Sequence, residues 1–265
     1  MSLRVGAVSF LNTVPLIEGL DDEPGIEVVA DLPSRLARSL DAGTIDVGLI
    51  PVAEYLRGVG GEIVPGLCIG AHGPVRTVKM FSQVPLARIE RVSVDRGSRS
   101  SVALMNVLLA ELYGLRPELE EFEPRREALF DRAPTALVIG DRADAIEGTG
   151  MLVVDLAALW NEVTGLPFVF ATWVLSPRLA PGPERDRLIE ALQAAYRRGR
   201  EHLDELARRE ASARGMDLHR VTSYWREHVH YDLGPQEIKG MERFADLARK
   251  HGQIPSPRAI AVAAV

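Results

Sequence analysis

Short apolar runs alternate with helical segments through the first two thirds of the chain. Residues 5–8, 46–50 and 91–94 are typical of buried strands. Residues 33–40 and 102–113 repeat apolar side chains at helical spacing. This alternation predicts an α/β architecture with a mainly parallel sheet.

A change of pattern near Pro85 predicts a crossing into a second lobe. We place residues 84–170 in that lobe, and residues 1–83 with 171–265 in the first. Beyond Pro181 the pattern is all helical. We therefore expect a two-lobed fold with a helical C-terminal region and a ligand cleft between the lobes.

Composition narrows the classes of partner. The 265 residues carry a formal net charge of −6, which argues against nucleic acid or an anionic membrane as a partner. The single cysteine, Cys68, has apolar neighbours, as expected of a buried structural thiol. The sequence shows no signal peptide and no stretch of 18 apolar residues, so we expect a cytoplasmic protein.

The first candidate site is the polar turn after residues 5–8. Asn12 stands where the N-cap of a helix over residues 13–20 is expected, with Pro15 in its first turn. A strand end followed by a helix N-terminus is a ready anion site. A purely structural cap fits the same pattern.

The second candidate is the turn at residues 97–101. Ser98, Ser100 and Ser101 provide three hydroxyls, and Arg99 could hold a carboxylate with two hydrogen bonds. A capping turn with an exposed arginine is the structural alternative. Because the two turns fall in different lobes, a cleft would bring them together.

Other candidates are weaker. Thr77 follows a Gly-Pro-Val entry into a strand and could face the cleft or be an ordinary strand threonine. His72 precedes the next histidine by 130 positions, so no Ser-His-Asp set is indicated. His228 and His230 alternate as strand neighbours would, but no third ligand is evident, so we predict no metal site. Nucleotide-binding motifs are absent, and we expect no cofactor.

Several linked motifs resemble the chorismate dehydratase family, which acts first in the futalosine route to menaquinone. The segments that carry the resemblance keep the family's order, at residues 9–16, 50–56, 73–75, 98–102, 139–141 and 164–171. Together they cover residues 5–175. The helical C-terminal third is less distinctive.

The resemblance implies a fold like a type II periplasmic binding protein, used as a cytoplasmic hydro-lyase. The implied reaction removes water from chorismate to give 3-[(1-carboxyvinyl)oxy]benzoate, without metal or cofactor. Asn12 and Thr77 match active-site positions, although the family carries serine where Thr77 stands. The match assigns substrate binding to Ser9, Ser98, Arg99, Ser100 and Ser101.

The resemblance does not identify the catalytic base. The substrate's own enolpyruvyl carboxylate could take the proton. Two alternatives remain. One is the related synthase that forms 1,4-dihydroxy-6-naphthoate, which is expected to use a histidine base and a different opening motif. The other is a non-catalytic sensor of small carboxylates on the same scaffold. The sequence leaves the oligomeric state open.

Overall fold

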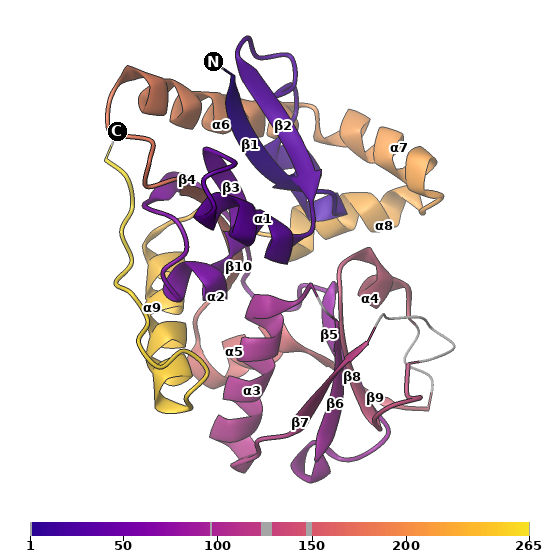
Figure 1. The fold of residues 1–265 in the computed structure, drawn as a ribbon. Helices are drawn as coiled ribbons and strands as arrows, with labels where there is room; N and C mark the ends of the chain where they lie inside the picture. The colour runs from indigo at the N-terminus through magenta and orange to yellow at the C-terminus, as the bar shows by residue number, and fades with distance from the viewer. Residues whose placement is uncertain (1, 96, 123–128, 147–149, 265) are drawn as a thin grey trace.

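Two five-stranded mixed sheets form the centres of two lobes (Figure 1). The computed structural model describes residues 2–95, 97–122, 129–146 and 150–264. The first sheet has the order β2-β1-β3-β10-β4, and its strands are β1 (Leu3–Val8), β2 (Ile26–Asp31), β3 (Val47–Pro51), β4 (Ile63–Ala71) and β10 (Phe168–Leu175). The second has the order β7-β6-β8-β5-β9, and its strands are β5 (Val78–Ser82), β6 (Arg91–Asp95), β7 (Glu118–Phe122), β8 (Thr135–Ile139) and β9 (Leu152–Asp155). The predicted two-lobed α/β fold is confirmed.

Each sheet contains one strand that runs against both of its neighbours. β10 is antiparallel to β3 and β4, and β5 is antiparallel to β8 and β9. Four of the five strands in each sheet therefore run in one direction, so each sheet is mainly parallel with a single reversed strand. β5 follows the passage into the second lobe and β10 follows the return, so a strand of reversed direction marks each crossing of the chain.

The crossings also bear on the lobe boundaries. A boundary after residue 83 would separate β5 from β8 and β9, with which it pairs over its full length. We therefore propose that the chain crosses between β4 and β5 and returns between Thr164 and Phe168. Pro85 then follows the first strand of the second lobe and does not mark the crossing.

Helices cover both sheets and make up the C-terminal third, as predicted. They are η1 (Leu11–Leu16), α1 (Pro33–Asp41), α2 (Val52–Leu56), η2 (Leu86–Arg88), α3 (Arg99–Tyr113), α4 (Asp141–Ala145), α5 (Leu156–Thr164), α6 (Pro183–Glu201), α7 (Leu203–Arg214), α8 (Leu218–Ser223), the π-helical turn η4 (Tyr224–His228) and α9 (Pro235–Lys250). Within the described ranges, no helix is long and apolar enough to cross a membrane.

A shared aromatic cluster joins the lobes on the side of α9. Trp160 of α5 lies edge-to-face on Phe168 of β10, with ring centroids 5.4 Å apart. Phe244 of α9 packs on both rings, at 6.2 and 5.1 Å. All three side chains are buried, and such pairs contribute about 0.5–1.5 kcal/mol beyond their area. The cluster fixes the lobes to each other next to the cleft.

Candidate functional site

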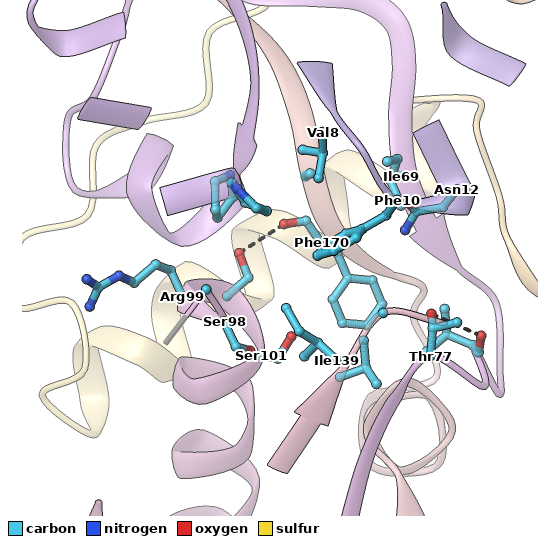
Figure 2. Close-up of a pocket in the computed structure, with 18 residues that line it drawn as sticks. Val8, Phe10, Asn12, Ile69, Thr77, Ser98, Arg99, Ser101, Ile139 and Phe170 are labelled. Carbon is cyan, nitrogen blue, oxygen red and sulfur yellow. Dashed lines mark hydrogen bonds between the residues drawn. The ribbon is translucent and has the colours of Figure 1, made fainter. Parts of the chain in front are cut away.

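A pocket lies between the lobes, at the ends of strands from both sheets (Figure 2). β1, β3 and β8 end at its wall, and the N-terminus of α3 faces it. Its empty space is about 610 Å³, including the part that is open to solvent. Ligands in α/β folds bind at the carboxyl ends of strands in this way.

Asn12 contributes to the pocket from inside a short 3-10 helix. η1 begins after Phe10 and shows no side-chain cap, so the expected helix over residues 13–20 with Asn12 as its N-cap is wrong. Pro15 lacks an N–H and cannot continue the hydrogen-bond ladder, which keeps the helix short. The Asn12 amide is therefore not used as a cap, and it lines the pocket.

Thr77 and Asn12 are joined through Tyr224, a residue that the sequence analysis did not single out. Thr77 Oγ1 lies 2.9 Å from Tyr224 Oη, and the Asn12 side chain is close enough to the phenol to lower its pKa in part. Tyr224 is 2% exposed, and burial raises the pKa of its hydroxyl well above the usual value. The phenol is thus a neutral link that can donate one hydrogen bond and accept another. Tyr224 lies in a helical segment that carries no recognisable motif, so its sequence gives no indication of this role.

Arg76 sets the position of Thr77. Its backbone is left-handed, with φ at 66°, which is rare for a residue other than glycine. The Arg76 N–H donates to Asp155 Oδ2 at 2.6 Å, and its guanidinium donates to both carboxylate oxygens of Asp144 at 3.0 and 2.9 Å. These charged contacts offset the backbone strain and hold the lobe crossing in one conformation.

Asp144 is the centre of this buried ionic cluster. Burial alone would raise its carboxyl pKa, but hydrogen bonds from Arg220 and Arg76 outweigh it and lower the pKa. Lys79 lies 3.7 Å from the same carboxylate, and burial lowers the pKa of its ammonium group. The cluster ties α4 of the second lobe to α8.

Ser98 precedes α3 and faces the pocket with an unused hydroxyl. The side chain is 4% exposed, and its Oγ has no hydrogen-bond partner in the described part of the chain. A buried hydroxyl without a partner is costly. Next to it, the first N–H groups of α3 lack intrahelical partners and give the 15-residue helix a positive end at the pocket. This arrangement suits a bound carboxylate.

Ser100 and Ser101 also line the pocket, but their hydroxyls differ. Ser100 Oγ donates to the Phe170 carbonyl at 2.9 Å and accepts from the Ala53 N–H at 3.2 Å. Ser100 therefore joins the second lobe to the first and has little capacity left for a ligand. Ser101 is buried beside it.

Arg99 and Ser9 lie differently from what the sequence predicts. Arg99 borders the pocket, but Figure 2 shows its guanidinium extending away from Phe170 and Thr77. Ser9 is exposed and stands outside the pocket lining, while its carbonyl accepts from Arg214 at 3.4 Å. Neither side chain points a polar group into the pocket in this conformation.

The remaining wall is apolar. Val8, Ile69, Val75, Ile139 and Phe170 line it, and among the described lining residues Arg99 is the one with an ionisable side chain. Electrostatic interactions are stronger in such a low-dielectric space than in water. Side chains that can ligate metals come together elsewhere, at His72, His230 and Glu237.

Asp141 closes one side of the cleft from the second lobe. It lies 3.1 Å from Arg214 of α7, and the nearby Leu11 backbone of the first lobe lowers its pKa in part. Burial raises the pKa of this carboxyl despite the arginine. Gly140 next to it approaches Phe10 closely enough that an added Cβ would touch the ring at 3.5 Å. The two lobes are therefore in contact along this side of the cleft.

Residues 3–250 match the model of the menaquinone biosynthesis family. The chain belongs to this family. A chorismate dehydratase from Thermus thermophilus is 31% identical over 261 residues, which cover 91% of this chain and 93% of that protein.

Solved structures support the fold of this menaquinone biosynthesis family member. Protein AF1704 from Archaeoglobus fulgidus has a TM-score of 0.75 at 17% identity and covers 96% of this chain and 98% of its own. The periplasmic aliphatic sulphonate binding protein SsuA from Escherichia coli has a TM-score of 0.65 at 16% identity, with 98% and 90% covered. The expected periplasmic-binding-protein-like fold is confirmed.

Proposed function

We propose that the chain is a chorismate dehydratase that converts chorismate to 3-[(1-carboxyvinyl)oxy]benzoate and water. The similarity to the Thermus thermophilus enzyme supplies the reaction. One observation supports assigning the reaction to this pocket. Asn12 and Thr77, which both adjoin Tyr224, lie opposite the N-terminus of α3. A dicarboxylate with a reacting ring between its anionic groups fits such a pocket.

The chemistry needs little from the protein beyond position and electrostatics. The ring carboxylate acidifies, through the conjugated double bond, the proton on the carbon that bears the enolpyruvyl ether. Its removal gives a dienolate, and expulsion of the neighbouring hydroxyl with a proton then forms water and an aromatic ring. We assign the ring's hydrogen-bonding contacts to Asn12 and Thr77, which orient the reacting centre and stabilise developing charge.

The base is the substrate's own enolpyruvyl carboxylate in this proposal. The described lining residues include no carboxylate, imidazole or amine that could take the proton. Ser98, Ser101 and the N–H groups at the start of α3 bind a substrate carboxylate. Ser100 holds this cradle against Phe170. Such a reaction suits the cytoplasm, where we place the enzyme.

The test is incubation of the purified protein with chorismate, followed by chromatography and mass measurement. We expect a product lighter by one water that depends on the protein. Thr77→Val is the matched control because it keeps the shape of the side chain and removes the hydroxyl that contacts Tyr224. A product that forms equally fast with Thr77→Val would come from a contaminant or from chemistry that does not use this pocket. Saturable chorismate binding without product would instead favour the sensor.

A further inference from the structure

Two histidines and a buried glutamate meet on the surface of the first lobe, outside the pocket. His72 follows β4, His230 follows η4, and Glu237 lies in the first turn of α9. One potential ligand atom from each lies within 4.8 Å of the other two. No third ligand for His228 and His230 is evident in the sequence, because the fold brings His72 and Glu237 to His230 from distant positions.

The glutamate oxygen at the centre of this group lacks a regular hydrogen bond. Glu237 is 4% exposed, and its Oε1 is buried without a hydrogen-bond partner in the described residues. Yet Oε1 lies 2.7 Å from His72 Nε2 and 3.5 Å from His230 Nε2. Oε1 thus lies within ion-pair distance of both imidazole nitrogens but has no hydrogen bond in the described residues, and a cation between the three atoms would supply its partner.

The backbone holds the three side chains in place. His230 exchanges two 2.8 Å backbone hydrogen bonds with Gly70, two residues before His72. The second oxygen of Glu237, Oε2, accepts from the Gly234 N–H at 2.9 Å and so is fixed by the capping of α9. The imidazole rings of His72 and His230 stand edge-to-face, with centroids 4.2 Å apart. Ligands held by rigid elements form a preorganised site.

We propose that His72, His230 and Glu237 bind a divalent transition-metal ion of the Zn²⁺ class. Zinc bonds to nitrogen and oxygen are about 2.0–2.1 Å long, which places tetrahedral ligand atoms about 3.3 Å apart. The two measured separations from Oε1, 2.7 and 3.5 Å, bracket that value. Imidazole nitrogens select zinc, nickel or copper over magnesium and calcium, which prefer oxygen ligands.

The histidine side of the site is accessible to solvent. The side chain of His72 is 49% exposed and that of His230 is 34% exposed, so solvent reaches the histidine side of the group. One water would complete a tetrahedral shell. His72 lies five positions before Thr77 on the lobe crossing, so the ion would fix this crossing to the N-terminus of α9. The inference does not rest on the proposed dehydratase activity.

Metal binding by the full-length, tag-free protein tests the proposal. We expect one equivalent of Zn²⁺ to bind with a dissociation constant in the micromolar range by titration calorimetry. Excess Zn²⁺ should raise the melting temperature by about 3 °C or more, because an ion that binds only the folded state stabilises it. Co²⁺ should give visible absorption of a tetrahedral site, and Mg²⁺ should change neither readout.

Variants assign the binding to these residues. His72→Ala removes a half-exposed side chain, and Glu237→Gln keeps an oxygen for the Gly234 cap while it removes the charge. Each should weaken Zn²⁺ binding at least tenfold, whereas His219→Ala, at an exposed histidine outside the group, should leave it unchanged. Binding by His72→Ala and Glu237→Gln that matches the unmodified protein would overturn the proposal. So would a wild-type dissociation constant above about 1 mM.

Discussion

Thr77 Oγ1 lies 2.9 Å from Tyr224 Oη, in a buried contact that joins the lobe crossing to the helical C-terminal third. The same phenol lies next to the side chain of Asn12 of η1, which lowers its pKa in part. Two pocket residues that are far apart in sequence thus adjoin one hydroxyl. The position of the proposed catalytic pair therefore depends on a residue behind the pocket wall.

We expect Tyr224→Phe to lower kcat for chorismate by about tenfold or more while KM changes little. The change removes one hydroxyl and leaves Thr77 and Asn12 without their common anchor, at a cost of about 1–3 kcal/mol. Steady-state kinetics and a thermal melt check this. Because burial raises the pKa of Tyr224, its hydroxyl stays protonated through neutral pH, so the loss should be independent of pH in that range. An unchanged kcat with a lower melting temperature would reduce Tyr224 to a structural role.

Asn12→Ala should leave the fold intact and reduce turnover by about 100-fold, the usual cost of losing one donor to developing charge. Asn12 lines the pocket and does not cap η1, so its removal affects the site more than the helix. The matched control is Asn161→Ala, which removes an amide that donates to the Leu166 carbonyl away from the pocket. Chorismate turnover by Asn12→Ala at the rate of Asn161→Ala would contradict the assigned role.

We expect substitutions at the neighbouring residues Ser98 and Arg99 to have different effects on chorismate binding. Ser98→Ala should weaken chorismate binding by about tenfold, because a hydrogen bond to a charged group contributes about 1.5–3 kcal/mol. The free protein should be at least as stable, since the buried Ser98 hydroxyl has no partner in the described residues. Arg99→Ala should change binding less than threefold, since the guanidinium points away from the pocket (Figure 2). Calorimetric titration separates them, and a larger effect at Arg99 would show that its side chain turns inward on binding.

These results show what the sequence could and could not predict. The turns after residues 5–8 and before α3 were recognisable because polar residues follow apolar strands, and strand ends converge in this class of fold. Tyr224 lies 147 positions from Thr77, and nothing in its local sequence indicates that contact. The direction of Arg99 depends on a side-chain rotamer that composition does not fix.

The reversed strands were missed for a related reason. β10 is a continuous apolar run, and such a run does not reveal whether the strand is parallel or antiparallel to its neighbours. Its direction follows from the two crossings between the lobes, a property of the whole chain. The start of η1 differs from the prediction because Asn12 matches the common N-cap preference, whereas the helix already begins at Leu11.

Asp144→Asn should destabilise the protein by about 3 kcal/mol at pH 7, because it leaves Arg76 and Arg220 without their buried carboxylate. The pKa of Asp144 is lowered in the folded state. Its contribution is therefore present above the ordinary aspartate pKa of about 3.9 and is lost as the pH falls through the folded-state value.

Urea unfolding at a series of pH values checks this prediction. The gap between wild type and Asp144→Asn should be widest near neutral pH and narrow below about pH 4. Asp246→Asn, which breaks an exposed pair with Arg249, should cost less than about 0.5 kcal/mol at any pH. A gap at Asp144 that stays constant down to acid pH would mean that packing, not charge, holds Arg76.

Gly199→Ala should destabilise the fold and displace the proposed active site together. Gly199 of α6 lies against η1, where an added Cβ would stand 2.1 Å from the Pro15 carbonyl oxygen. Overpacking of this kind costs about 1–3 kcal/mol, which exceeds the gain of about 1 kcal/mol from replacing glycine in a helix. Because η1 carries Asn12, kcat for the protein that remains folded should fall as well. Arg197→Ala, on the exposed side of α6, should change neither quantity. A Gly199→Ala variant with a higher melting temperature and full activity would show that η1 moves aside freely and that the position of Asn12 does not depend on α6.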